Sequence, residues 1–252
     1  MAGVSRAHAP ASVFRVARTS TVDLIAIELR NAIYSGALAV GASLGEAEIS
    51  AQLGVSRGPF REAAQRLVQE GLLTAIPGRG LRVSQIPPES VGDVYEARLA
   101  IEAQAVRRIV QDGRASGIDA IERGYRELVR VSDGDDAREI GDADLAFHQI
   151  LVDAAGSPRL SRMMTTLVME TRIASFSQPD GYSVRRSVSP SYEALLAALR
   201  GGDAAAAVAA LETQFGEAVA RLNGETEIET VETDAEPEGL QPIEPGALSD
   251  GV

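Results

Sequence analysis

Three polar side chains spaced four residues apart form the first candidate binding surface of the chain. Arg57, Arg61 and Gln65 fall on one stripe of a predicted helix. Each guanidinium offers forked N–H donors that suit a phosphate or the edge of a guanine. The adjacent side of the helix is apolar; it carries Phe60, Ala63, Ala64 and Leu67. The pattern predicts a helix that is buried on one side and can bind nucleic acid on the other.

A second candidate is the pair Asp144 and His148, spaced i, i+4 on one face of another predicted helix. A carboxylate and an imidazole aimed at one point could ligate a metal, bind a polar ligand, or exchange protons together with Tyr192. The same spacing is typical of a surface ion pair, or of a core histidine whose hydrogen bond is satisfied. The pair alone leaves these alternatives open.

The arginine stripe lies within an ordered run of predicted elements. A short helix over 46–53 breaks at Gly54, and a longer helix over 57–70 follows, with Ser56 as its N-cap and Pro59 in its first turn. The flanking elements are a helix at 19–35, a strand at 72–76, a turn at 77–80 and a strand at 81–84. Together they predict a winged helix-turn-helix domain.

The pattern from residue 89 to 224 is helical throughout. Pro87 and Pro88 separate it from the winged domain, because neither flanking element is expected to continue through them. The predicted helices lie at 91–110, 118–131, 137–155, 158–176, 190–200 and 204–222. The predicted fold class is therefore mainly α: an N-terminal winged helix-turn-helix domain followed by an all-α helical bundle.

An ordered set of residues in the first part of the chain identifies a family. They are Leu53-Gly54-Val55-Ser56-Arg57, Pro59, Arg61-Glu62-Ala63, Arg66-Leu67, Glu70-Gly71-Leu72 and Pro77-Gly78-Arg79-Gly80. Residues 20–86 thereby resemble the DNA-binding domain of the GntR family of bacterial transcription regulators. The resemblance implies a homodimer on a palindromic, double-stranded DNA operator.

The same resemblance implies which residues contact DNA. Arg57 and Arg61 would enter the major groove, beside Ser56, Gly58 and Gln65, and the wing turn Gly78-Arg79 would touch the minor groove or the backbone. Family members often carry Thr where this chain has Gly58, and some carry Arg where it has Ala47. These departures leave the operator sequence open.

The helical part resembles the FCD domain, the ligand-binding half of the FadR branch of this family. The matching residues are Val94-Tyr95-Glu96, Arg98, Glu102, Asp144, His148 and Leu195 to Asp203. The resemblance implies that Asp144, His148, Tyr192, Gln214, Arg98 and Arg172 face a small effector, which in this branch is often a carboxylate. For Arg98 an i, i+4 salt bridge with Glu102 is the alternative, and for Arg172 it is a solvated position. Arg185 and Arg186 are expected at the surface.

Many FCD domains bind a metal through one Asp and three His, and in this chain two of those His positions are Tyr192 and Gln214. The chain has only two His, His8 and His148, so a three-His site is excluded. A phenol and an amide are poor substitutes for imidazole on zinc. We therefore expect no metal cofactor and direct contact between these side chains and the effector. The alternative is a weakly bound divalent ion held by Asp144 and His148 and completed by water and a ligand carboxylate.

Composition and charge set the remaining expectations. Without Cys, disulfides and thiolate metal sites are excluded, and with no long apolar run a cytoplasmic protein without membrane contact is expected. The net charge of −12 is unevenly distributed: residues 1–86 carry nine Arg and six acids, whereas residues 225–252 carry nine acids and no base. The predicted divisions are a flexible basic leader (1–18), the winged domain (19–86), a linker (87–92), an effector-binding and dimerisation domain (93–224) and a disordered acidic tail (225–252).

These features predict a ligand-responsive transcription regulator rather than an enzyme. A DNA-binding regulator without ligand response is the first alternative. An enzyme that uses Asp144 and His148 is the second, although the sequence supplies neither a nucleophile nor a glycine loop for phosphate. The acidic tail could be solubilising, or it could be autoinhibitory by competing for the basic face of the winged domain.

Overall fold

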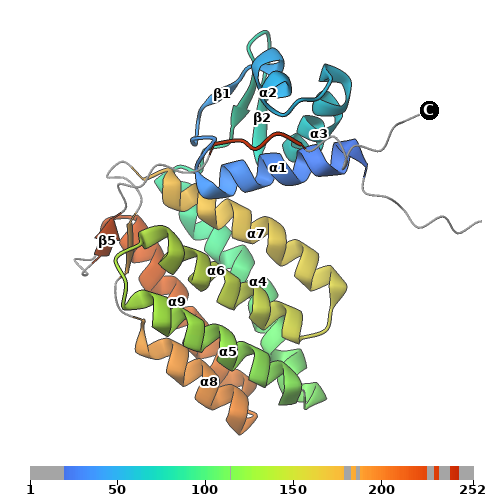
Figure 1. Ribbon diagram of the computed structural model, residues 1–252. Helices are drawn as coiled ribbons and strands as arrows, with labels where there is room; N and C mark the ends of the chain where they lie inside the picture. The colour runs from blue at the N-terminus through green and yellow to red at the C-terminus, as the bar shows by residue number, and fades with distance from the viewer. Residues whose placement is uncertain are drawn as a thin grey trace, which may run out of the picture.

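The computed structural model of the protein describes residues 20–113, 115–178, 183–185, 188–225, 230–232 and 239–243. These residues form a small domain that sits on one end of a larger helical domain (Figure 1). The two parts correspond to the predicted winged domain and helical bundle, so the predicted fold class is confirmed. The predicted basic leader lies outside the described residues.

The small domain combines helices with a short antiparallel sheet. Its elements are α1 (Thr21–Ser35), β1 (Ser43–Leu44), α2 (Glu46–Gln52), α3 (Arg57–Gln69), β2 (Leu73–Ile76) and β3 (Gly80–Val83). The strand order is β1-β3-β2, with Leu73 opposite Val83 and Ser43 opposite Arg82. The two-residue strand β1 was not predicted, because it is too short to show an alternating pattern.

Glycines make the turn before α3 and the turn of the β2–β3 wing. Gly54, between α2 and α3, has φ +68°, and Gly78 in the β2–β3 turn has φ +72°. These are left-handed conformations that side chains with a Cβ rarely adopt. The turns aim α3 and the β2–β3 wing outward from the domain core, which contains Ile25, Leu53, Phe60 and Leu67.

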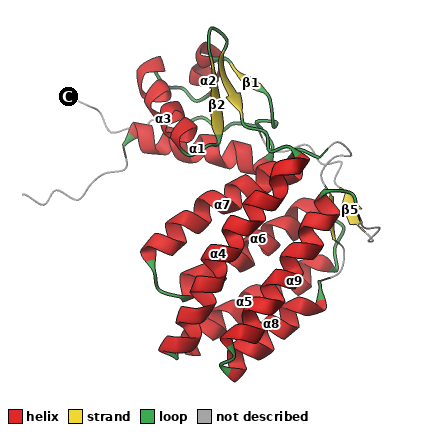
Figure 2. Cartoon of the chain, turned by 180° about the vertical axis from the view of Figure 1, so that it is seen from behind, coloured by secondary structure: helices red, strands yellow, loops and turns green. Residues whose placement is uncertain are grey.

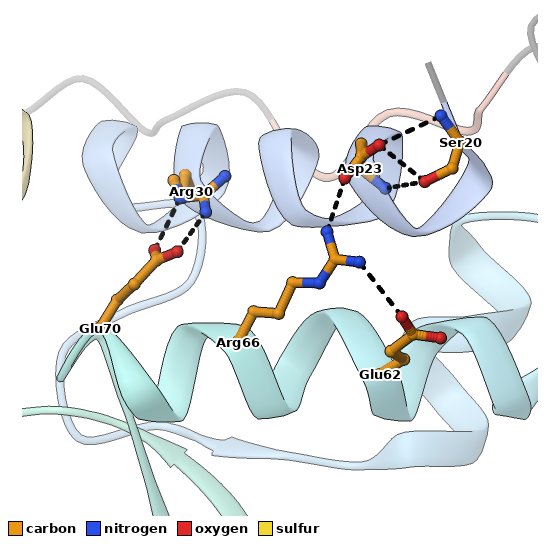
Figure 3. Close-up of polar contacts among 6 residues, drawn as sticks. All are labelled: Ser20, Asp23, Arg30, Glu62, Arg66 and Glu70. Carbon is orange, nitrogen blue, oxygen red and sulfur yellow. Dashed lines mark hydrogen bonds and ion pairs between the residues drawn. The ribbon is translucent and has the colours of Figure 1, made fainter. Parts of the chain in front are cut away.

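Ion pairs lock α3 against α1 (Figure 3). Arg30 on α1 makes two hydrogen bonds to Glu70, at 2.9 and 2.5 Å. One turn earlier on α3, Arg66 pairs at 2.5 Å with Asp23 in the first turn of α1, and Asp23 closes a capping box with Ser20. The side of α3 that carries Arg66 is therefore fixed, and the opposite side remains exposed.

The larger domain is a bundle of long helices (Figure 2). Its elements are α4 (Pro88–Asp112), α5 (Ala115–Ser132), α6 (Ala137–Ala154), α7 (Pro158–Phe176), β4 (Ser183–Arg185), α8 (Pro190–Gly201), α9 (Ala204–Leu222) and β5 (Thr230–Glu232). The core between the helices contains Val106, Phe147, Leu151, Leu195 and Leu211, each fully buried. No helix in the described part of the chain is long and apolar enough to span a membrane.

Two boundaries differ from the predicted divisions. Helix α4 begins at Pro88, so most of the predicted linker over 87–92 is helical. A proline is tolerated at the first helical position because an N–H there has no intrahelical partner. Within the predicted disordered tail, β5 pairs antiparallel with β4, and residues 239–243 contact the winged domain. Tertiary contacts order these short pieces, which local composition does not reveal.

Candidate functional site

The predicted binding stripe lies on the exposed face of α3. Arg57, Arg61 and Gln65 are all exposed, as are Ser56 and Gly58 at the start of the helix. Ser56 is the N-cap, with extended backbone (φ −77°, ψ 156°) and no side-chain capping bond to any described residue. Its hydroxyl and the first-turn N–H groups are therefore open to an anion, which a helix N-terminus attracts.

Arg61 is held in place by a neighbouring helix. Its side chain is 69% exposed, and its Nε donates a 2.8 Å hydrogen bond to Glu46 on α2. An exposed ion pair of this kind is weak, so a DNA phosphate or base can replace Glu46 as the partner. Gly78 and Arg79 lie exposed at the tip of the wing. The geometry therefore brings α3 and the wing to the surface as two separate contact elements.

The helical domain contains a cavity of about 80 Å³. Helices α5, α6, α8 and α9 and strand β4 contribute its lining. The polar and charged residues in the wall are Ser132, Asp144, Arg185, Ser189, Tyr192, Gln214, Glu217 and Arg221. This volume is well below the roughly 300–1,000 Å³ of sites that bind drug-sized ligands, so the cavity suits a molecule of few heavy atoms.

Gln214 lies in the cavity wall, and its amide makes no hydrogen bond to any described residue. It is 5% exposed, and neither its amide oxygen nor its nitrogen has a hydrogen-bond partner among the described residues. Arg221 Nε is likewise buried without such a partner. A buried donor or acceptor without a partner costs about 1–3 kcal/mol. A ligand with both acceptors and donors would satisfy these groups.

A chain of hydrogen bonds leads from the cavity into the core. The Tyr192 hydroxyl donates to Asp144 and lies 3.5 Å from His148 Nε2. On the other side of the imidazole ring, His148 Nδ1 is 2.6 Å from Glu102, which also accepts a 3.1 Å bond from Arg98 Nε. Burial, together with the Asp144 carboxylate, raises the pKa of Tyr192 well above its ordinary value. Tyr192 is therefore a neutral hydrogen-bond donor at the cavity wall.

These residues do not fit the metal that the fold family implies. Within the described residues, no group of three or more His, Cys, Asp or Glu could hold a metal ion. Asp144 accepts from Tyr192, and the contact of His148 Nδ1 with Glu102 leaves Nε2 as the ring nitrogen that could ligate an ion. A phenol and an amide are weak ligands for zinc, so Asp144 and His148 are two good ligands where a stable zinc site has three or four. The hydroxyl of Tyr192 contacts both Asp144 and His148.

The other predicted effector residues lie at different depths. Arg98 does not line the cavity: it is 1% exposed, pairs with Glu102, and stacks over Tyr95 and Phe215 at 5.0 and 4.7 Å. His148 lies behind Tyr192 and is not part of the cavity wall. The i, i+4 salt bridge considered for Arg98 is thus the arrangement that the structure contains.

Arg172 lies at the joint between the two domains rather than at the cavity. Its guanidinium is 4.4 Å from the ring centre of Tyr34 at the end of α1 and pairs with Asp142 on α6. Burial raises the pKa of Asp142, and Arg172 opposes that rise. Burial also raises the pKa of Tyr34, whose hydroxyl bonds with Arg172 and Asp142. Arg172 is buried, so the solvated position considered from sequence does not apply either.

Further contacts extend this joint. Arg138 on α6 donates to the carbonyl of Ser35. Phe176 at the end of α7 packs against Gly36, since a Cβ added to this glycine would lie 3.4 Å from the ring. Met169 and Ile173 of α7 belong to the core cluster of the winged domain. Helix α6 therefore contributes to the cavity through Gly141 and Asp144, and to the joint between the domains through Arg138 and Asp142.

Sequence reasoning missed part of the cavity wall. Arg185 was expected at the surface, yet it lines the cavity and pairs with Glu217 at 2.8 Å. Glu217 and Arg221 follow Gln214 on α9 at i+3 and i+7, which places all three on one helical face. That spacing was the signal available for Glu217 and Arg221. Glu102 was recognised only as a partner of Arg98, because its contact with His148 joins residues 46 positions apart.

Comparisons with known proteins agree with both halves of this geometry. Residues 21–83 match the model of bacterial regulatory proteins of the gntR family, and residues 93–216 match the FCD domain. The chain is 30% identical to the "Probable D-xylose utilization operon transcriptional repressor" of Paenarthrobacter nicotinovorans, over 62% of this chain and 69% of that protein. It is 26% identical to the uncharacterized HTH-type transcriptional regulator YdhC of Bacillus subtilis (strain 168), over 54% of this chain but only 62% of that protein.

A solved structure extends the likeness to both domains. The crystal structure of a transcriptional regulator GntR from Rhodococcus sp. RHA1 covers 82% of this chain and 99% of its own, with a TM-score of 0.63 and 27% identity. The names of these relatives describe transcription regulators. The chain belongs to the GntR family and is a DNA-binding transcription regulator with a C-terminal FCD domain.

Proposed function

We propose that this regulator binds a palindromic DNA operator as a homodimer and changes its DNA affinity when a small polar metabolite enters the cavity. The observation that carries the ligand response is the buried amide of Gln214, which has no partner among the described residues. A core built only for stability would avoid such a group. The Gln214 amide and Arg221 guanidinium together favour a small carboxylate that also carries hydroxyl or amino groups.

The DNA contacts in this proposal come from α3 and the wing. Arg57 and Arg61 reach the major groove with Gln65 beside them, while Ser56, Gly58 and the first-turn amides of α3 approach a phosphate. Gly78 and Arg79 touch the minor groove or the backbone. One α3 helix reads only a few base pairs, so a two-fold dimer doubles the contacts. The operator is to be found by selecting bound duplexes from a random pool.

Helix α6 offers the route from the cavity to the winged domain. Gly141 and Asp144 line the cavity, and Asp142 between them pairs with Arg172 under Tyr34 of α1. A ligand that draws Asp144 away from Tyr192 would turn or shift this stretch of α6, and Asp142 would move with it. The relative position of the DNA-reading domains would then differ between the two states.

The test is a thermal-shift screen of small carboxylates (sugar acids, hydroxy acids and amino acids) on the wild type and on Gln214→Leu. We expect Gln214→Leu to raise the melting temperature without ligand, because it removes an unsatisfied buried amide costing about 1–3 kcal/mol. A true effector should stabilise the wild type, change its operator affinity, and leave Gln214→Leu unaffected. A regulator whose operator affinity ignores every compound that binds would be the ligand-independent alternative.

A further inference from the structure

A short piece of the C-terminal segment, residues 239–243, lies against the winged domain. The backbone N–H of Ile243 donates to the carbonyl of Leu53 at 3.1 Å, and the N–H of Gln241 donates to Glu28 on α1 at 2.9 Å. In Figure 1 this segment is the red stretch that runs alongside α1. About 190 to 213 residues separate the bonded partners, so tertiary structure alone brings them together.

The contact is apolar as well as hydrogen-bonded. Leu240 and Ile243 are partly buried and pack against the winged-domain core cluster, which includes Ile25, Leu53 and Phe60. Pro242 between them lacks an N–H and fixes its own φ, which favours an extended segment whose neighbours supply the donors. We call residues 239–243 the anchor segment.

The anchor segment is attached close to the DNA-reading helix. Leu53 ends α2, where helix carbonyls have no intrahelical partner, and the Ile243 N–H satisfies one of them. Helix α3 begins at Arg57, four residues after Leu53. The anchor therefore joins the helix-turn-helix motif at its turn.

Charge gives this attachment a consequence for DNA binding. Residues 225–252 contain nine acids and no base, and Glu236, Glu238 and Glu244 flank the anchor segment in sequence. Tethering such a segment to the domain that exposes Arg57 and Arg61 gives it a high effective concentration there. Glu238 and Glu244 adjoin the anchor segment directly in the sequence. Charges interact over about a Debye length, ~8 Å at physiological salt, so carboxylates must be held close to the domain to act on it.

We propose that the anchor segment binds the acidic C-terminal segment to the winged domain and thereby lowers the affinity of this domain for DNA. The negative charge opposes the DNA phosphates that the arginines of α3 would neutralise. The inhibition is intramolecular and independent of the effector cavity, so it operates whether or not a metabolite is bound. It weakens as salt rises, because both the acidic segment and the phosphates are screened.

The first test undocks the anchor in the full chain with Leu240→Ser plus Ile243→Ser. Leu248→Ser is the matched control, since it makes the same change in the same acidic segment outside the anchor. Hydrogen exchange at the amides of Gln241 and Ile243 reports docking, and affinity for a mixed-sequence duplex reports inhibition. We expect faster exchange and several-fold tighter binding at low salt in the double variant only, with the difference lost at high salt.

A second variant separates charge from packing. Glu236→Gln plus Glu238→Gln plus Glu244→Gln keeps the apolar anchor and should tighten DNA binding at low salt while exchange at Gln241 and Ile243 stays slow. The proposal is overturned if the anchor variant exchanges faster with unchanged DNA affinity, because the contact is then only structural. Fast exchange of both amides in the wild type would overturn it as well, since the anchor would not be docked.

Discussion

At the scale of single residues, the polar groups of this protein divide into satisfied and unsatisfied ones. Arg98, Glu102, His148, Tyr192 and Asp144 are linked by a chain of contacts, although Arg98 Nη2 has no partner among the described residues. Such a network is stable only as a unit, because removing one member leaves the next one buried and unpaired. Gln214 lies in the cavity wall, and its amide has no partner among the described residues. We therefore expect Arg98, Glu102 and His148 to be structural, and Asp144, Tyr192 and Gln214 in the cavity wall to respond to the ligand.

The residue-scale prediction for metal binding concerns Tyr192 and Gln214, which stand where many FCD domains have metal-binding His. Wild-type protein purified without chelator should contain far less than one zinc per chain by elemental analysis. The double variant Tyr192→His plus Gln214→His places two more imidazoles beside Asp144 and His148, and should hold about one zinc per chain. The single variant Tyr192→Phe is the control and should hold none. Near-stoichiometric zinc in the wild type would show that other ligands complete the site.

The residue-scale prediction for DNA binding concerns Arg61. If it reads a base with both arms of its guanidinium, Arg61→Ala should weaken operator binding roughly ten- to hundredfold and relax the sequence preference at one position. Arg162→Ala, an exposed arginine on α7, should leave binding unchanged. Competition experiments with operator variants measure both effects. An equal loss on every sequence would make Arg61 a phosphate contact instead.

At the scale of elements, the orientation of α3 depends on its ion pairs with α1. Arg30–Glu70 and Arg66–Asp23 both join the last turn of α3 to α1, and Ser20 caps α1 where Asp23 forms its pair (Figure 3). Because these ion pairs are at the surface, each one alone contributes little to the free energy of unfolding. Their effect depends on the cap, the two pairs and the fixed geometry acting together. Losing the α1 cap should loosen α1 first and the placement of α3 second.

The element-scale prediction follows from the pKa of Asp23. Its hydrogen bonds with Ser20 and then Arg66 lower that pKa below the ordinary 3.8. A carboxyl with a lowered folded-state pKa stabilises the fold above its unfolded pKa, and this stability is lost as the pH falls through the folded pKa. Ser20→Ala removes the cap and the first cause of the shift. We expect a loss of about 1 kcal/mol at neutral pH and a smaller loss well below pH 3.8.

Thermal unfolding of the wild type and Ser20→Ala over a pH series measures this difference. Thr213→Ala on α9 is the control, because its hydroxyl donates to the Ala209 carbonyl rather than to a carboxylate. The cost of Thr213→Ala should not depend on pH. A cost of Ser20→Ala that grows as the pH falls would contradict the assigned role of Asp23.

At the scale of the whole molecule, two sets of contacts among the described residues join the winged domain to the rest of the chain besides the peptide linker. One is the joint of Tyr34, Arg172, Asp142 and Arg138, which α6 and α7 carry. The other is the anchor segment, which follows β5, and β5 pairs with the cavity strand β4. Both connections start from elements that line the cavity or lie beside it. The winged domain is thus positioned by the helical domain and not by its linker alone.

The whole-molecule prediction concerns Arg172. Arg172→Met removes the cation over Tyr34 and leaves Asp142, which is about half exposed, to be hydrated by water. We expect a stability loss of about 2 kcal/mol, in the range for hydrogen bonds to charged groups, with faster hydrogen exchange in the last turn of α1. Arg159→Met, at an exposed position on the same helix, is the control. Unchanged exchange in α1 would show that this pair does not hold the domains together.

The local sequence determined the elements and the surfaces they present. Helical periodicity, the cap at Ser20 and the break at Gly54 are properties of a few adjacent residues, so they are readable without a fold. The exposed stripe of Arg57, Arg61 and Gln65 follows from the apolar positions of the same helix. The short strands β1, β4 and β5 were not readable, since two or three residues cannot display a period.

Only the tertiary structure decided which polar groups meet. Arg172 is on the predicted helix, but its rotation relative to α1 directs it to Tyr34 and not to the cavity. Glu102 meets His148, and Ile243 meets Leu53, across separations that no local pattern encodes. A helix periodicity defines a face, whereas the partner of that face depends on how all the helices pack. The family and the elements were therefore determined by sequence, and the cavity wall, the domain joint and the anchor by packing.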